Sequence, residues 1–141
     1  MRYLGSYTYQ LDDKGRVSLP AAFRRDARDQ RFVLVQAYPP ALALYPEAEW
    51  AGVEERLREL LRLQPASRPY VLSVMAGAVE VVPDAQGRIL IPQRLQEAAS
   101  LKGQVLLVGA IDKIEIWNPA DFEVALQGAS DFAAYAPQIF R

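Results

Sequence analysis

Residues 12–20 read Asp-Asp-Lys-Gly-Arg-Val-Ser-Leu-Pro, and residues 84–92 read Asp-Ala-Gln-Gly-Arg-Ile-Leu-Ile-Pro. The two stretches align at an offset of 72 residues, and the same offset, without a gap, aligns four shorter blocks. Chance supplies one such match but not five at one offset, so the chain is predicted to be a tandem of two copies of one unit that pack as a pseudo-two-fold pair. The shorter blocks are Phe23 with Leu95, residues 33–35 with 105–107, residues 42–45 with 114–117, and Trp50 with Phe122.

Each copy contains the same order of predicted elements. A strand enters the Asp-x-x-Gly-Arg turn, a short strand leaves it, and Pro20 or Pro92 then starts a short helix, because proline suits the first helical turn. An apolar β-branched strand, an alternating strand and a closing helix follow. The strands predicted after the turns are 17–19, 32–36, 42–45, 89–91, 105–108 and 114–117, and the predicted helices are 21–28, 46–63, 93–100 and 119–128.

The two copies are predicted to depend on each other for folding. The first unit covers residues 1–64, the second covers residues 70–141, and a linker with two prolines, residues 64–69, joins them. A unit of about seventy residues with such short strands is poorly placed to bury its apolar faces alone. We therefore expect one compact α+β domain made from two intertwined halves.

Apolar side chains also predict contacts outside the strands. The helix at 46–63 carries them at spacings of three and four residues, which is typical of a helix with one buried face. The tail, residues 129–141, carries a second group, and we expect it to dock on another surface, such as that of a neighbouring chain. The helix group is Trp50, Val53, Leu57, Leu60 and Leu61, and the tail group is Phe132, Tyr135, Ile139 and Phe140.

The composition excludes several kinds of chemistry. The 141 residues include no cysteine and no histidine, which excludes disulfides, thiolate catalysis and cysteine-type zinc sites and removes the usual general base. We therefore expect a protein that is not an enzyme and that uses no metal and no cofactor. The sequence contains no signal peptide pattern and no apolar run of membrane-spanning length, which predicts a cytoplasmic chain with no membrane partner.

Charge is distributed unevenly along the chain. Lys and Arg total 16 and Asp and Glu total 17, a net charge of −1, which alone argues against nucleic-acid binding. Residues 1–36, however, hold seven bases against four acids, whereas residues 111–141 hold two bases against five acids. A protein polarised in this way can present one basic face to DNA while its acids lie elsewhere.

The Asp-x-x-Gly-Arg turn is the strongest candidate for a functional site. Its glycine suits a positive φ angle and its aspartate accepts backbone hydrogen bonds, which are structural roles. Its arginine carries five donors in a planar fork that suits a phosphate or a guanine edge. An arginine here can equally be a solvated side chain, and recurrence alone does not separate the two alternatives. The structural residues are Asp12, Gly15, Asp84 and Gly87, and the candidate DNA-binding residues are Arg16 and Arg88.

Further basic residues are expected around the first turn. Lys14, Arg24 and Arg25 are candidates for contacts with DNA phosphates, although Arg24 and Arg25 can equally form a solvated helix face. The second copy has Ala85 and Gln86 in place of Asp13 and Lys14, and a glutamine and a glutamate at 96–97 in place of the two arginines. If both turns bind DNA, the second is expected to contribute less electrostatically.

Residues 11–24 resemble the signature of the MraZ family, and residues 86–92, 108–109 and 115–117 resemble its second motif. Two linked motifs that together cover nearly the whole chain make the resemblance highly specific. It implies two AbrB-like ββαββα units interlocked as a pseudo-two-fold swapped-hairpin β-barrel with flanking helices. It also implies a ring of identical chains, either an octamer or a dodecamer.

The resemblance carries a function as well. Members of the family bind repeated short G-rich elements in double-stranded DNA upstream of the division and cell wall gene cluster, which includes their own gene, and regulate its transcription. We expect this chain to act as a nucleoid-associated repressor of that kind. The DNA-contacting role carries over to Arg16, Arg88 and, less directly, Lys14. Ala22 and Ala85 depart from the family, whose members often have a basic residue at those places.

Other classes of function remain open from the sequence alone. An oligomeric interaction module would act mainly through a protein partner, and the acidic C-terminal segment and the aromatic tail would form its surface. An AbrB-like antitoxin is a third possibility, but such proteins usually carry one motif per chain, unlike the two found here. An enzyme comes last, because no convergent set of catalytic residues is apparent.

Overall fold

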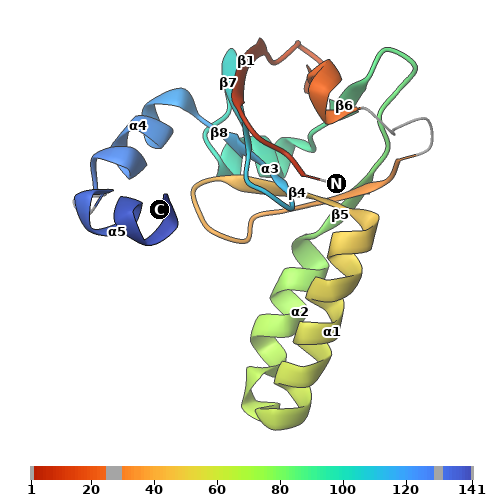
Figure 1. Cartoon of the computed structure of the whole chain (residues 1–141). Helices are drawn as coiled ribbons and strands as arrows, with labels where there is room; N and C mark the ends of the chain where they lie inside the picture. Colours follow the sequence, from red (N-terminus) through yellow and green to blue (C-terminus); the bar gives the residue numbers. More distant parts are fainter. Residues whose placement is uncertain (1, 25–29, 129–131, 141) are drawn as a thin grey trace.

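A computed structural model describes residues 2–24, 30–128 and 132–140 of the chain. Short strands and helices alternate along it, and the paired strands are antiparallel, so the predicted α+β class is confirmed. The elements in chain order (Figure 1) are β1 Ser6–Gln10, β2 Arg16–Ser18, the 3-10 helix η1 Ala21–Phe23, β3 Phe32–Val35, β4 Leu42–Pro46, α1 Glu47–Leu63, the 3-10 helix η2 Pro65–Ser67, α2 Arg68–Gly77, β5 Val79–Val81, β6 Arg88–Leu90, α3 Gln93–Ala98, β7 Gln104–Gly109, β8 Ile114–Trp117, α4 Pro119–Gln127 and α5 Phe132–Ile139.

Strands of the two halves are interleaved. Six of them form one sheet in the order β1-β7-β8-β4-β3-β5, and β2 and β6 form a separate two-stranded ribbon. Each strand of the first half is hydrogen-bonded to a strand of the second half, in the pairs β1–β7, β2–β6, β3–β5 and β4–β8. Neither half can therefore complete its own hydrogen bonding without the other.

The strand order reveals a pseudo-two-fold axis. Exchanging the two halves, β1 with β5, β3 with β7 and β4 with β8, leaves the order of the large sheet unchanged. The axis passes through two strand pairs whose members are 72 residues apart. Val17 lies opposite Ile89 in the ribbon, and Ala43 lies opposite Glu115 at the centre of the sheet.

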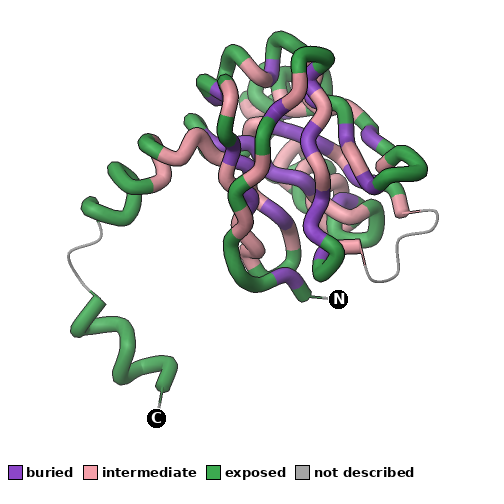
Figure 2. The backbone as a smooth tube through the Cα atoms, turned by 90° about the horizontal axis from the view of Figure 1, so that it is seen from above, coloured by how far each residue is buried: buried purple, intermediate pink, exposed green. Residues whose placement is uncertain are grey.

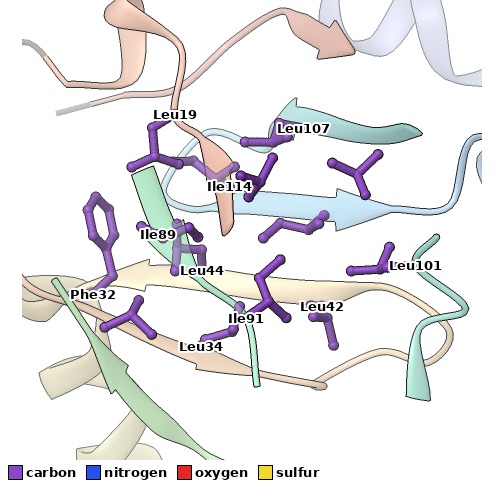
Figure 3. Packing of buried hydrophobic residues seen from close by; sticks show 14 of the residues in the cluster. Leu19, Phe32, Leu34, Leu42, Leu44, Ile89, Ile91, Leu101, Leu107 and Ile114 are labelled. Atoms are coloured by element: carbon purple, nitrogen blue, oxygen red, sulfur yellow. The ribbon is translucent and has the colours of Figure 1, made fainter. Parts of the chain in front are cut away.

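The hydrophobic core lies between the ribbon and the large sheet, and both halves contribute to it (Figure 3). From the ribbon side, Leu19 and Ile91 follow the buried central residues of β2 and β6. Leu44 and Ile114 face them from the sheet, and all four side chains are at most 1% exposed. Full burial of such a side chain contributes about 1.5–3 kcal/mol, so the core ties the ribbon to the sheet and the two halves to each other.

The third strand of each half, β3 in the first and β7 in the second, departs from the ungapped repeat. Thr8 of β1 pairs with Leu106 of β7, so an exact offset of 72 would pair Glu80 of β5 with Leu34. Glu80 instead pairs with Val33. The alignment of 33–35 with 105–107 is therefore wrong by one residue, and a hairpin that is one residue shorter in the second copy restores the offset at β4 and β8.

A helical hairpin formed by α1 and α2 projects from the sheets (Figure 1). The helix predicted at 46–63 is present as Glu47–Leu63. The stretch 64–69, however, is only partly a linker. Its second proline, Pro69, lies in the first turn of α2, where a proline is well tolerated, and the helix continues to Gly77. The sequence pattern predicted no helix at 68–77.

The remaining helices are shorter than α1. The closing helix predicted at 119–128 is α4, and the side chain of Asn118 caps it by accepting hydrogen bonds from the N–H groups of Ala120 and Asp121. The helix predicted at 21–28 is described only as the 3-10 turn Ala21–Phe23, because residues 25–29 lie outside the described part. No helix within the described ranges is long and apolar enough to cross a membrane.

Candidate nucleic-acid interface

One carboxylate holds the first turn, residues 12–16. Oδ1 of Asp12 accepts hydrogen bonds from the backbone N–H groups of Lys14 (2.9 Å) and Arg16 (2.8 Å), and Oδ2 accepts one from Nε of Arg16 (2.8 Å). The turn thus fixes the orientation of the Arg16 guanidinium, with its Nε edge toward Asp12. Its Nη groups have no hydrogen-bond acceptor within the described part of the chain.

The second turn, residues 84–88, repeats this arrangement. Oδ1 of Asp84 accepts hydrogen bonds from the N–H groups of Gln86 and Arg88, both at 2.9 Å, and Oδ2 accepts one from Nε of Arg88, also at 2.9 Å. In both turns the aspartate therefore has two roles. It closes the backbone turn, and it positions the arginine.

The same hydrogen bonds lower the pKa of both aspartates. For Asp12 the largest cause is the backbone N–H of Arg16, and for Asp84 it is the backbone N–H of Arg88. The arginine side chains and the second turn N–H also lower these pKa values, and loss of hydration opposes them. Both carboxylates are therefore ionised at neutral pH and are paired with their arginines.

The turn glycines adopt a conformation that other residues rarely accept. Gly15 has a φ of +85° and Gly87 a φ of +79°, both in the left-handed region. A Cβ on Gly15 would lie 2.3 Å from Nε2 of Gln96 and 3.0 Å from the backbone oxygen of Ile91. A Cβ on Gly87 would lie 2.4 Å from Nη1 of Arg24. Both glycines thus also permit a close approach by another segment.

A side chain from the opposite half covers each turn. Nε of Arg24 donates to the backbone oxygen of Leu19 (2.9 Å), and its guanidinium lies against the glycine of the second turn. Nε2 of Gln96 donates to the backbone oxygen of Ile91 (2.7 Å), and its amide lies against the glycine of the first turn. Arg24 and Gln96 are equivalent in the repeat. The expectation that Arg24 lies beside the first turn is therefore wrong, because the interleaved strands bring it to the second.

This exchange changes the charge expected at each turn. The first turn carries Lys14 and Arg16 within its own sequence. The second turn carries Arg88 and is covered by Arg24 from the first half. Two cationic side chains therefore lie at each turn. The reason to expect a weaker electrostatic contribution from the second turn to DNA binding thus disappears. Arg25 lies outside the described residues.

Both turns lead into the ribbon and place their arginines on one face of it. Arg16 lies opposite Leu90, and Ser18 lies opposite Arg88. Alternate residues of a strand share a face, so these four residues form the outer face of the ribbon, whereas the central residue of each strand is buried. Arg16 and Arg88 are diagonal neighbours there, and such neighbours typically lie about 7–8 Å apart.

Three residues of this interface were missed by sequence reasoning. Ser18 and Leu90 follow from the alternation of the strands, because each lies two residues beyond a candidate arginine. Leu90 is 55% exposed. Gln96 gave no signal, because its importance depends on how the two halves interleave.

The chemistry that this arrangement supports is the binding of an anion or of a base edge. Oriented guanidinium groups donate hydrogen bonds in a plane, which matches a phosphate or a guanine. No group of three or more His, Cys, Asp or Glu side chains suited to a metal ion occurs within the described part of the chain.

A family model and individual relatives both match this chain, and they carry the same family name. A family model described as "MraZ protein, putative antitoxin-like" matches residues 3–70 and again residues 74–138. The two matches correspond to the two copies of the repeat, so nearly the whole chain is covered.

Individual relatives are similar over most of their length. A protein named "Transcriptional regulator MraZ" from Desulfitobacterium hafniense is 38% identical over 136 residues, which cover 96% of this chain and 94% of that protein. Proteins of the same name from Pediococcus pentosaceus and Azotobacter vinelandii are each 38% identical, over 125 and 140 residues. These alignments cover 89% and 96% of this chain and 87% and 91% of the relatives.

Proposed function

The chain belongs to the MraZ family, and we propose that it is a transcription regulator that binds double-stranded DNA through the outer face of the β2–β6 ribbon. The observation that carries this proposal is the pair of arginines on that face, each oriented by an aspartate of its own turn. A two-stranded ribbon has the width to enter the major groove of B-DNA. The names of the relatives support a role in transcription.

The proposal assigns different contacts to different residues. Arg16 and Arg88 extend their Nη groups to base edges or to the phosphates that flank them, since Nε of each is engaged by aspartate. Lys14 and Arg24 contact phosphates, which fix the position of the ribbon but carry no sequence information. Leu90 offers an exposed apolar surface that suits a thymine methyl group.

A finer architecture follows from the family and fits the interleaved strands. We propose that units 1–64 and 70–141 form one domain with an AbrB-like swapped-hairpin arrangement, and that several chains assemble into a ring, either an octamer or a dodecamer. One ribbon offers few cations, and the net charge of the chain is −1, so a single chain should bind DNA weakly. Several ribbons that reach successive repeats on one duplex would add avidity.

The proposed target is a set of repeated promoter elements upstream of the division and cell wall gene cluster, including the gene for this chain, with repression as the effect. Fluorescence anisotropy tests this with DNA from that region and with scrambled DNA of equal length, at several salt concentrations. Tighter binding to the promoter DNA that persists at moderate salt supports the proposal. Equal binding of both DNAs that vanishes with salt contradicts it and favours action through a protein partner.

Arginine variants test the site itself. Arg16→Ala and Arg88→Ala should each weaken promoter binding and reduce the slope of log K against log[salt] by about 0.9 for each phosphate that the variant no longer neutralises. Arg62→Ala is the matched control, because Arg62 is also paired with an acid, Glu59, but lies on α1 away from the ribbon. Unchanged binding by a folded Arg16→Ala variant would remove the arginine from the interface.

A further inference from the structure

A second surface of the molecule is built to receive an apolar partner. The α1–α2 hairpin, the loop between β3 and β4, and α3 enclose a groove with a volume of about 770 Å³. Its floor includes Trp50, Val53 and Leu57, which belong to the apolar stripe of α1. Tyr38 and Tyr70 line it too, and they are 73% and 58% exposed. Grooves of this size accept several side chains of a helix.

The charge of the groove restricts what can occupy it. Arg56 and Arg94 are the charged side chains among its described lining residues, and no acid accompanies them. Nη2 of Arg94 donates to the backbone oxygen of Gly77 (2.9 Å), which holds this guanidinium at the wall beside α2. An apolar occupant that also carries negative charge is therefore favoured.

The same chain carries a segment with these properties. Four side chains of the tail are 62–81% exposed, and Figure 2 shows α5 lying away from the body of the molecule with its whole length exposed. The spacing of Phe132, Tyr135 and Ile139 places these three on one side of α5. Residues 118–131, which lead into α5, contain three acids and no base, whereas α5 itself carries no charged residue. The four side chains are Phe132, Tyr135, Ile139 and Phe140.

We propose that α5 of one copy docks in the α1–α2 groove of a neighbouring copy. The contact is of the helix-in-groove type, with apolar anchors three, four and seven residues apart. It is also heterologous, because it joins two different surfaces, and such contacts close into rings when the rotation between copies permits. The proposal therefore rests on the oligomeric assembly proposed above and supplies its contact.

A neighbouring copy is the occupant that the geometry favours over the chain's own tail. Phe122 of α4 packs against Trp117 of β8 with ring centroids 5.4 Å apart, which anchors the start of the C-terminal segment to the sheet. The α4–α5 segment and the α1–α2 hairpin then project from the body in different directions (Figure 1).

Disulfide cross-linking tests the contact directly, because the chain has no cysteine of its own. Ser73→Cys places a thiol in the groove with almost no change in shape, and Tyr135→Cys places one on α5. When the two single variants are mixed, assembled and oxidised, mass spectrometry should find a peptide that links positions 73 and 135. Ala51→Cys is the control, since residue 51 lies on the exposed side of α1 away from the groove lining.

The cross-linking outcomes are decisive. A linkage of 73 to 135 between different chains, without a linkage of 51 to 135, supports the proposal. The absence of any 73–135 linkage in the mixture overturns it. A double variant that cross-links only within one chain also overturns it, because the tail would then occupy its own groove.

The assembly state gives a second and independent measurement. Tyr135→Glu should shift the mass measured by light scattering from an oligomer toward a single chain, whereas Ala134→Glu, on the opposite side of α5, should leave the oligomer intact. Tyr135 is 62% exposed, so the thermal unfolding of the single chain should not change. An intact Tyr135→Glu oligomer overturns the proposal. An oligomer that cross-links but does not bind promoter DNA removes the proposed function and leaves this contact standing.

Discussion

The two arginine turns have the same backbone and aspartate hydrogen bonds but differ in the side chain that covers their glycine. The hydrogen bonds that the aspartates accept agree within 0.1 Å between the turns. Gln96 covers the first turn and Arg24 covers the second, and each comes from the opposite half. The duplicated framework is therefore the same in both turns, and one difference between them lies in residues that cross from one half to the other.

The largest difference between the turns should appear when their glycines are changed. Gly15→Ala and Gly87→Ala each force a Cβ into the left-handed region, which costs about 1–2 kcal/mol. Gly15→Ala should cost more, because its Cβ also meets the backbone oxygen of Ile91 at 3.0 Å, whereas at Gly87 the nearest atoms belong to the flexible side chain of Arg24. Urea denaturation of both variants measures the difference.

A double-mutant cycle sharpens the same comparison. Arg24→Ala removes the side chain that a Cβ at position 87 would meet, so Gly87→Ala should cost less in that background. Equal destabilisation by Gly15→Ala and Gly87→Ala, with no coupling between positions 24 and 87, would mean that the covering side chains do not matter for the turns.

The second difference is the positive charge of the covering side chain, Arg24, at the second turn. Substitutions at positions 24 and 96 can move this charge to the first turn. Arg24→Gln should retain the hydrogen bond to Leu19, because Gln96 makes the equivalent bond with its own amide. It should reduce the salt slope of DNA binding by about 0.9, the value for one phosphate contact. Gln96→Arg should raise the slope by a similar amount by adding a cation to the first turn.

The exchange of both residues is the matched control for this prediction. Arg24→Gln combined with Gln96→Arg keeps the net charge and both packing contacts and only moves the cation. If both turns bind DNA, the salt slope of the double variant should equal that of the natural chain. A slope that follows Arg24→Gln alone would show that only the second turn is in contact with phosphates.

The sequence predicted the local features of this site well. The alternation of apolar residues identified the strands, and the Asp-x-x-Gly-Arg pattern identified the turns and the structural role of Asp12 and Asp84. These features depend on residues close together in the chain, so a single copy contains the necessary information. The helix α2 was missed because Pro65, before it, and Pro69, in its first turn, are also typical of a linker.

Features that depend on the partner half were not predictable in the same way. The shift of one residue at β3 is hidden, because every residue of 33–35 and 105–107 is apolar and either alignment matches equally well. The location of Arg24 beside the second turn depends on strand exchange between the halves, and nothing adjacent to it in the sequence reports that exchange. Long-range pairing decides both.

The smallest expected effect is the loss of stability when the aspartate of a turn can no longer ionise, and in this the two turns should behave alike. The pKa of Asp12 and of Asp84 is lowered in the folded chain from the ordinary value of 3.8, first of all by a backbone N–H. A lowered folded-state pKa stabilises the fold above the ordinary pKa, and this contribution is lost as the pH falls through the lowered value.

Asp12→Asn and Asp84→Asn keep the side-chain oxygen that accepts the turn N–H groups but cannot ionise. Each variant should therefore be less stable than the natural chain at pH 7, and the gap in urea midpoint should narrow as the pH falls below about 4. Because the hydrogen bonds of the turns agree so closely, the two gaps should be similar. A gap for Asp12 alone would mean that the positive charge of Arg24, which covers the second turn, alters the contribution of Asp84 across the interface between the halves.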